Sequence, residues 1–231
     1  MNLSAIAENL KCVRDEIEES RKRSLTGEEV KLIAVTKTHG VDIMEEAIKL
    51  GVTDVGENKV QELTEKMDLI GDKVRYHMIG NLQSNKVKYI YQDVALIHSL
   101  DRSSLAKEIE KRAKQTDHIV PCLLQVNIGD EVSKGGLAYD GVLPFLESIL
   151  DYKHIKVDGL MAIAPNVEDE AYLRKLFRKM FALKEDINNR NYEGVDMTYL
   201  SMGMSNDFSI AIEEGANMVR VGSRIFGKRH Y

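Results

Sequence analysis

The chain has 231 residues, of which 43% are hydrophobic and 30% are charged, and its formal net charge is -5. A chain of this kind can bury a substantial core, and its acidic balance argues against general nucleic-acid binding. No apolar run could span a membrane, no leader pattern opens the chain, and its two cysteines lie far apart. We therefore expect a cytoplasmic protein that binds neither membranes nor nucleic acid. We also expect a monomer, although nothing in the composition bears on the oligomeric state.

The chain opens with an amphipathic pattern that precedes any strand-like run. Its apolar residues recur at helical spacing and are Leu3, Ile6, Ala7, Leu10, Val13 and Ile17. We predict a helix within residues 1–24 that packs on the remainder of the chain. Because no Ser/Gly linker or low-complexity tract follows, we expect residues 1–231 to form one domain.

Eight short runs rich in β-branched residues come next, and each predicts a strand. They are 31–37, 53–57, 75–80, 95–100, 121–127, 156–164, 197–203 and 217–223. Helical patterns lie between them, most clearly at 102–115 and 173–187. Eight alternating strand–helix units favour a single closed (β/α)8 TIM-type barrel over an open sheet. Since only RIFGKRHY follows the last strand, we expect the N-terminal helix to replace the missing final helix.

Polar residues concentrate where the predicted strands end, which is the face that carries the sites of such barrels. Lys37 is the last residue of the first predicted strand. A lysine at such a position usually marks the solvated end of a strand, with its ammonium group in water. A partly desolvated amine, however, loses basicity and can attack a carbonyl group to form a Schiff base.

Two further clusters follow the seventh and eighth predicted strands. Ser205 lies in SMGMSND (201–207), and Gly222 and Ser223 lie in VRVGSRIFG (219–227). Loops at these two positions often hold a phosphate group, because glycine permits a close backbone approach.

Arg220 shares the inward direction of Gly222, and a buried guanidinium needs an acceptor. An ion pair with a carboxylate such as Glu57 is one alternative, and a ligand is another. In a closed barrel the eighth strand pairs with the first, so Lys37 should lie beside Arg220 and the phosphate loop. An amine, a phosphate cradle and an arginine together suggest a phosphorylated aldehyde, and the vitamin B6 cofactor pyridoxal 5′-phosphate (PLP) fits all three.

The sequence also resembles the pyridoxal phosphate homeostasis proteins (the YggS/PROSC group) over nearly its whole length. The motifs are AVTKTH (34–39), VGENKVQE (55–62), HMIGNLQSNK (77–86), HSLD (98–101), QVNIGDEVSKGGL (125–137), GLMAIAP (159–165), LSMGMSNDF (200–208) and VRVGSRIFG (219–227). The resemblance implies a PLP-binding barrel similar to the N-terminal domain of alanine racemase. The site residues it implies are Lys37 as the Schiff-base lysine, Ser205, Gly222 and Ser223 at the phosphate, Arg220 at the pyridine nitrogen, and Asn58 as a further pocket residue. The sequence SKGG at 133–136 departs from the usual SKSG, which leaves the role of the 129–137 loop open.

The predicted arginine bears on what the protein does with PLP. Many PLP enzymes keep the pyridine nitrogen protonated with a carboxylate, whereas arginine favours the unprotonated nitrogen and a weaker electron sink. Racemases of the related barrel add a base from a second domain, which we expect this chain to lack. The resemblance therefore implies a PLP carrier or regulator that acts in PLP homeostasis and amino-acid/keto-acid balance without clear turnover, with PLP-dependent apo-enzymes as candidate partners.

Two enzymatic alternatives stay open, namely a small PLP-dependent amino-acid racemase and a Schiff-base aldolase that uses Lys37. His39, Tyr76, His77 or Tyr199 could in principle supply a base, but we expect ordinary packing for each. No HExxH, Cys/His cluster or phosphate-binding GxxxxGK[ST] motif occurs, so we expect neither a metal nor a nucleotide site.

Overall fold

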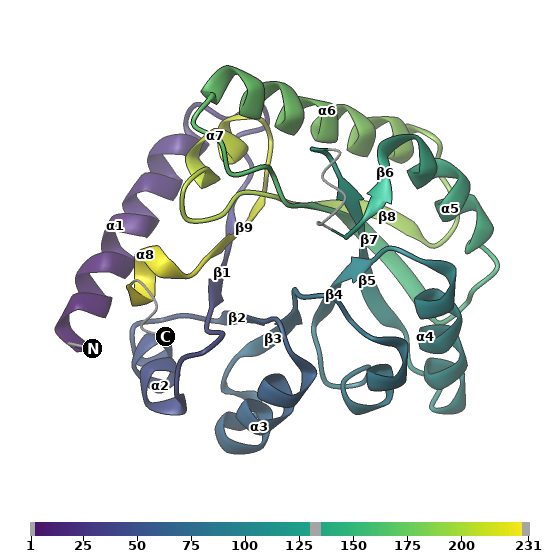
Figure 1. Ribbon diagram of the computed structural model, residues 1–231, viewed down its shortest axis with the longest axis horizontal. Coiled ribbons are helices and arrows are strands. Elements are labelled where there is room, and N and C mark those ends of the chain that lie inside the picture. The colour runs from purple at the N-terminus through teal and green to yellow at the C-terminus, as the bar shows by residue number, and fades with distance from the viewer. Residues whose placement is uncertain (1–2, 130–134, 228–231) are drawn as a thin grey trace.

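The computed structural model describes residues 3–129 and 135–227, which form a ring of strands surrounded by helices (Figure 1). The strands are β1 (Lys31–Val35), β2 (Asp54–Glu57), β3 (Arg75–Met78), β4 (Leu96–Leu100), β5 (Val120–Asn127), β6 (Leu137–Ala138), β7 (Ile155–Ala162), β8 (Val195–Ser201) and β9 (Met218–Val221). The α-helices are α1 (Leu3–Arg21), α2 (Val41–Lys49), α3 (Val60–Ile70), α4 (Ser103–Gln115), α5 (Val142–Ser148), α6 (Glu170–Asn189), α7 (Phe208–Glu213) and α8 (Ser223–Phe226). Short 3-10 helices span Gly71–Lys73, Ser84–Tyr89 and Tyr139–Gly141.

The strands close into the parallel barrel that the sequence predicts. β1 pairs with β2 on one side and with β9 on the other, and a β4–β5 pairing completes the ring. The eight strands of the ring coincide with the eight predicted runs. β6, which was not predicted, is a two-residue strand that pairs with the end of β5 outside the ring.

The end of β1 differs from the prediction in a way that concerns Lys37. The strand ends at Val35, so Lys37 lies two positions beyond it in a turn and is not its last residue. Thr36 N–H still donates to Gly56 O of β2 at 3.2 Å, but Thr38 has a φ of 68°. Because this left-handed conformation cannot continue an extended strand, the backbone turns immediately after Lys37.

Apolar side chains form two separate layers, because successive residues of a strand point to opposite sides. The larger layer lies between the strands and the helices. The smaller layer fills the inside of the barrel and consists of Ile33, Leu96, Leu123, Met161 and Met218. The barrel is therefore a packed core along part of its axis, and its remaining inward positions carry polar groups.

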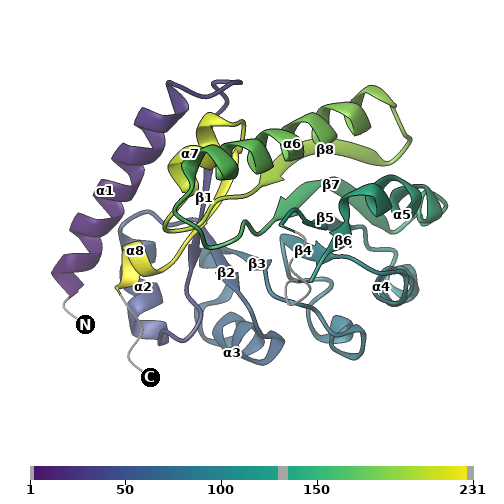
Figure 2. The ribbon, with the colours of Figure 1, turned by 45° about the horizontal axis from the view of Figure 1, so that its top comes forward.

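α1 lies alongside α7 and α8 in both ribbon views (Figure 1, Figure 2), and it also contacts α2. Its buried face consists of Ile6, Leu10, Val13 and Ile17. The last described element, α8, has only four residues, so α1 supplies much of the cover on this side of the molecule.

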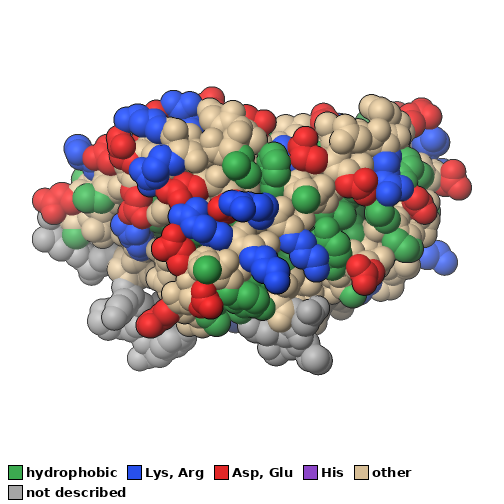
Figure 3. Space-filling view, turned by 90° about the horizontal axis from the view of Figure 1, so that it is seen from above, with side chains coloured by type: hydrophobic (Ala, Val, Ile, Leu, Met, Phe, Trp, Pro, Cys, Tyr) green, Lys and Arg blue, Asp and Glu red, His purple; other side chains and the backbone are tan. Residues whose placement is uncertain are grey.

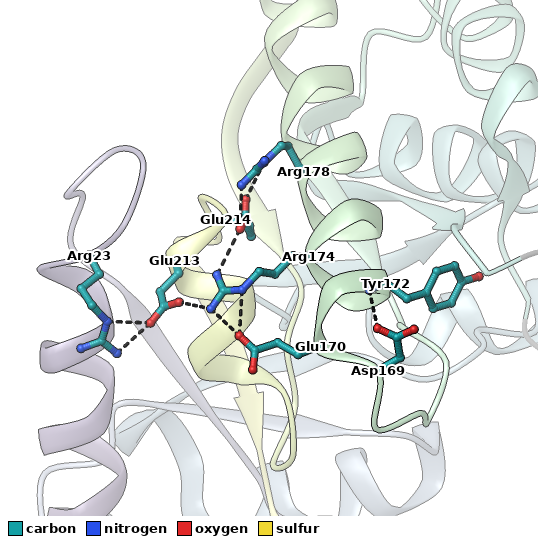
Figure 4. A network of polar contacts seen from close by, with 8 residues as sticks. All are labelled: Arg23, Asp169, Glu170, Tyr172, Arg174, Arg178, Glu213 and Glu214. Carbon is teal, nitrogen blue, oxygen red and sulfur yellow. Dashed lines mark hydrogen bonds and ion pairs between the residues drawn. The ribbon is translucent and has the colours of Figure 1, made fainter.

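An ion-pair network joins α6 and α7 to the segment that follows α1 (Figure 4). Arg174 of α6 pairs with Glu213 and Glu214 of α7 and its C-terminal end, and Arg178 also pairs with Glu214. Arg23 reaches the other side of Glu213 at 2.7 Å. Because Glu214 is only 2% exposed, the network contains a desolvated carboxylate and holds α7 in place behind the loop that contains Ser205.

Charge is mixed over the surface seen from above, where Lys and Arg side chains lie among Asp and Glu side chains (Figure 3). Such an arrangement differs from the single-sign stripe that is typical of a nucleic-acid footprint. Among the described helices, none combines the length and apolar character that crossing a membrane requires.

Candidate functional site

A cavity of about 560 Å³ opens at the carboxyl ends of the barrel strands. The six residues singled out from the sequence all line it, namely Lys37, Asn58, Ser205, Arg220, Gly222 and Ser223. They come from the segments after β1, β2 and β8, from β9, and from the start of α8. The volume is that of an ordinary small-molecule site.

The loop that carries Lys37 is anchored on both sides of the lysine. Thr36 O accepts a hydrogen bond from Lys66 Nζ at 2.8 Å, and Thr38 N–H donates to Glu62 Oε1 at 2.6 Å. Lys66 Nζ also donates to Glu62 Oε1 at 2.8 Å. One buried ammonium group of α3 thus connects both anchor points, and Lys37 itself is half-buried at the cavity wall.

Glu57 supplies a buried carboxylate beside this loop. It is 0% exposed and accepts hydrogen bonds from Lys66 Nζ at 2.7 Å and Thr36 Oγ1 at 2.5 Å. Burial raises the pKa of Glu57, although its contacts with Lys66 oppose the shift. Because Glu57 lies against α3, on the outer side of β2, the alternative of an Arg220–Glu57 ion pair inside the barrel is wrong.

Arg220 points into the barrel, as its predicted direction requires, and is 4% exposed. Its Nη1 donates to Ser201 O at 2.9 Å and to Ser201 Oγ at 2.7 Å, and its Nη2 donates to Ala162 O at 2.8 Å. Burial lowers the pKa of Arg220 to about 10, and the charge of Asp207 opposes this shift. The guanidinium is therefore still cationic at neutral pH, and oxygen acceptors of β7 and β8 hold it at the cavity.

Glycines shape the wall where a phosphate was predicted. Gly222 N–H donates to Ser205 Oγ at 3.4 Å, which joins the two predicted clusters. A Cβ atom on Gly222 would lie 3.1 Å from Val35 O. Gly203 has a φ of 93°, and a Cβ there would lie 2.8 Å from Phe208 Cα. Gly203 therefore needs to be glycine, both for its conformation and for close approach, whereas a side chain at Gly222 would require a small shift of Val35.

A third glycine, which sequence reasoning left outside the site, fixes the position of Asn58. A Cβ on Gly80 would lie 2.3 Å from Asn58 O, so the loops after β2 and β3 touch backbone to backbone. Asn81, Asp101 and Gln125 also line the cavity. Asn81 and Asp101 follow predicted strands, which was the available signal, but many Asn and Asp residues at such positions serve only as helix caps. Gln125 lies inside β5 and gave no such signal.

Sequence reasoning also missed a buried polar chain inside the barrel. Ser201 Oγ lies 3.2 Å from His98 Nδ1, His98 Nε2 lies 3.0 Å from His77 Nδ1, and His77 Nε2 lies 2.9 Å from Asp54 Oδ1. His77 is buried in the barrel core and does not line the cavity, and its ring bonds to polar groups on both sides, so it contributes more than apolar packing. Burial lowers the pKa of both histidines, so both are neutral at physiological pH.

The other three candidate bases lie away from the cavity wall. The His39 ring packs against Phe226 with the ring centroids 5.1 Å apart, and Tyr76 donates its hydroxyl hydrogen to Gly71 O at 2.8 Å. Tyr199 lines a different cavity, of about 550 Å³, at the opposite end of the barrel. In the 129–137 loop, Gly135 O accepts from Gln125 Nε2 at 3.0 Å, while residues 130–134 lie outside the described part.

Comparisons with known proteins match the chain over nearly its full length. The family model for the alanine racemase N-terminal domain matches residues 1–230. The pyridoxal phosphate homeostasis protein of Aquifex aeolicus is 41% identical over 226 residues, which are 97% of this chain and 98% of that protein. PipY of Synechococcus elongatus, solved with PLP bound, is 30% identical with a TM-score of 0.83, and the match covers 96% of this chain and all of that one.

Alanine racemase of Clostridium difficile has the same fold, with a TM-score of 0.78 at 14% identity over 99% of this chain and 57% of the racemase. The matches thus agree on the barrel, and the relatives above 30% identity agree on a narrower group. The chain belongs to the pyridoxal phosphate homeostasis protein family, whose members have the barrel of the alanine racemase N-terminal domain.

Proposed function

We propose that this protein binds PLP in the cavity at the carboxyl end of the barrel and acts in PLP homeostasis, with Lys37 holding the cofactor as a Schiff base. One observation carries the proposal. Six residues chosen for this chemistry from four separate parts of the sequence line one cavity, and they include an amine, two hydroxyl groups and a buried cation. The PLP-bound relative and the names of the relatives support the same cofactor.

Each part of PLP has a counterpart among these residues. The amine of Lys37 would meet the aldehyde, and the hydroxyl groups of Ser205 and Ser223 would meet the phosphate beside Gly222. Arg220 would face the pyridine nitrogen. Because a guanidinium can only donate hydrogen bonds, a ring nitrogen facing it must accept, and is therefore unprotonated.

The same arrangement supports a role without turnover. An unprotonated pyridine nitrogen is a poor electron sink for carbanion chemistry. Of the described residues that line the cavity, none is a His, Tyr or Cys, so the usual proton-transfer groups are lacking there apart from Lys37 and carboxylates. Delivery of PLP to apo-enzymes, residence in the cytoplasm and a monomeric state belong to the same proposal.

A PLP titration followed by visible absorbance tests the cofactor. The wild type should develop a Schiff-base band that borohydride removes while fixing the cofactor to Lys37. The Lys37→Ala variant should show no such band. Lys59→Ala is the matched control, because Lys59 is an exposed lysine near the same rim that does not line the cavity. A colourless wild type, or an unchanged band in Lys37→Ala, would contradict the proposal.

Two further assays separate a carrier from an enzyme. Deuterium exchange at the α-carbon of a panel of amino acids should stay at background, and rapid exchange that depends on Lys37 would show a racemase-type activity instead. Timed transfer of PLP to an apo-enzyme, with a trap for free PLP present, should continue despite the trap if transfer is direct. Transfer that the trap abolishes would show release into solution.

A further inference from the structure

The polar chain inside the barrel runs from the cofactor cavity to the opposite end of the molecule. Arg220 lines the cavity at the carboxyl ends of the strands. Asp54, the first residue of β2, lines the second cavity, at the amino ends of the strands. Between them the hydrogen bonds pass through Ser201, His98 and His77, all of which are at most 3% exposed. The chain therefore crosses the barrel interior without contact with solvent along its middle.

The chemistry of the two end groups, Arg220 and Asp54, sets the donor and the acceptor of every hydrogen bond between them. Arg220 can only donate, and ionised Asp54 can only accept. Burial alone would raise the pKa of Asp54, but hydrogen bonds from His77, Arg75 and Thr53 outweigh it and hold that pKa well below its usual range. The carboxylate is therefore ionised and accepts from His77.

The donor and the acceptor of each remaining hydrogen bond are fixed by the ionised carboxylate of Asp54. His77 uses its Nε2–H on Asp54, and because the neutral ring carries one hydrogen, its Nδ1 accepts from His98 Nε2–H. His98 Nδ1 in turn accepts the hydroxyl hydrogen of Ser201. The hydroxyl hydrogen thus points away from Arg220, and an oxygen lone pair of Ser201 faces the guanidinium.

We infer that His77 and His98 are positioning residues for Arg220, which act by orienting the Ser201 hydroxyl through a one-way hydrogen-bond chain anchored at Asp54. The inference rests on the proposed function only in that Arg220 is taken to face the PLP ring. If His98 held its hydrogen on Nδ1, the Ser201 hydroxyl would receive hydrogens from two sides and its own hydrogen would need another acceptor. Asp54 therefore controls the geometry of the cofactor site from the far end of the barrel.

Substitution of Ser201 tests the contact next to Arg220. In the protein without cofactor, nuclear magnetic resonance of the imidazole nitrogens should show both histidines with hydrogen on Nε2. In Ser201→Ala, exchange of the Arg220 guanidinium hydrogens with solvent should become roughly 10- to 100-fold faster, the factor that one hydrogen bond to a charged group represents. Ser99→Ala is the matched control, since Ser99 is 1% exposed but its hydroxyl has no hydrogen-bond partner among the described residues.

Substitution of Asp54 tests the chain from its other end. Asp54 Oδ2 accepts from Arg75 Nη2 at 2.8 Å and from Thr53 Oγ1 at 2.7 Å. In Asp54→Asn these two donors keep the remaining oxygen, so the amide NH2 group faces His77 Nε2. We expect both histidines to move their hydrogen to Nδ1, faster exchange at Arg220, and PLP binding that is roughly threefold to tenfold weaker, as one lost neutral hydrogen bond implies.

The outcomes separate this inference from the proposed function. Three results would each overturn the inference that this hydrogen-bond chain positions Arg220. They are wild-type histidines with hydrogen on Nδ1, unchanged Arg220 exchange in Ser201→Ala, and unchanged tautomers in Asp54→Asn. An equal effect of Ser99→Ala would also overturn it, because a general loosening of the barrel would then explain the result. If the wild type fails to bind PLP, the proposed function falls, while the cofactor-free measurements still decide whether the chain positions Arg220.

Discussion

The buried ion pair beneath the Lys37 loop offers a quantitative test of how this site is built. In Lys66→Met, the side chain keeps most of its volume but loses its ammonium group. Lys66 and Glu57 are 6% and 0% exposed at their side chains and lie 2.7 Å apart, so removing one charge leaves the other uncompensated. Breaking a buried pair in this way costs about 3–5 kcal/mol of stability.

Protonation of Glu57 limits that cost, because the variant can always neutralise the carboxyl group. Taking up a proton on a group whose ordinary pKa is 4.5 costs about 3.4 kcal/mol at pH 7, but only about 1.4 kcal/mol at pH 5.5. The pKa of Glu57 in the folded variant lies above its unfolded value, so the stabilising effect of protonation is present at low pH and is lost as the pH rises. Measured against the wild type at the same pH, the free energy of unfolding of the variant should therefore fall by about 2 kcal/mol between pH 5.5 and pH 7.

Urea unfolding at the two pH values measures this difference. In the double variant Lys66→Met with Glu57→Gln the fully buried carboxylate is gone, and Glu62, the other carboxylate that Lys66 contacts, is 23% exposed. The double variant should therefore recover most of the stability and show the same pH dependence as the wild type. Lys184→Met is the matched control, because Lys184 is also buried but pairs with no carboxylate in the described chain. A loss of stability in Lys66→Met that is the same at both pH values would refute the electrostatic explanation.

Three further predictions concern the fold and the polar interior. Removal of residues 1–24 should leave insoluble protein, because it uncovers the apolar surface beneath α1; a soluble truncation with native circular dichroism would contradict this. Burial keeps His77 and His98 neutral in the folded protein, so below the ordinary histidine pKa of 6.5 each takes up a proton on unfolding. Stability should therefore fall by up to about 1.4 kcal/mol per histidine for each unit by which the pH is lowered. Stability that is flat between pH 6.5 and pH 5.5 would mean that neither histidine takes up a proton on unfolding, which would contradict this argument. Gly203→Ala should cost about 2–4 kcal/mol in urea unfolding, since it adds a steric clash to an unfavourable φ. Gly194→Ala, at a φ of 76° with no atom within 4 Å, should cost only about 1–2 kcal/mol. Equal losses at the two positions would show that the steric contact at Gly203 does not matter.

The strands and the cavity residues could be predicted because their signals are local. Each strand appears as a short β-branched run between polar segments, and the barrel rule then places every strand end on one face. Lys37, Ser205 and Gly222 were found in this way, although the end of β1 was predicted two residues too late. The turn after Lys37 depends on Thr38, whose left-handed backbone is unusual for a β-branched residue and leaves no trace in a hydrophobic pattern.

The partners of the buried polar groups could not be predicted from local patterns. Arg220 was expected to need an acceptor, but whether Glu57 or Asp54 faces the barrel interior depends on strand direction and register, and a shift of one residue exchanges the two sides. His98 and Ser201 are 103 positions apart, yet their side chains bond because β4 and β8 close around one axis. Sequence patterns thus establish the elements, the barrel and the residues at its rim, since these follow from short-range periodicity. The pairing of Glu57 with Lys66 and the chain from Arg220 to Asp54 come from closure of the barrel, which brings distant positions together and makes burial enforce their hydrogen bonds.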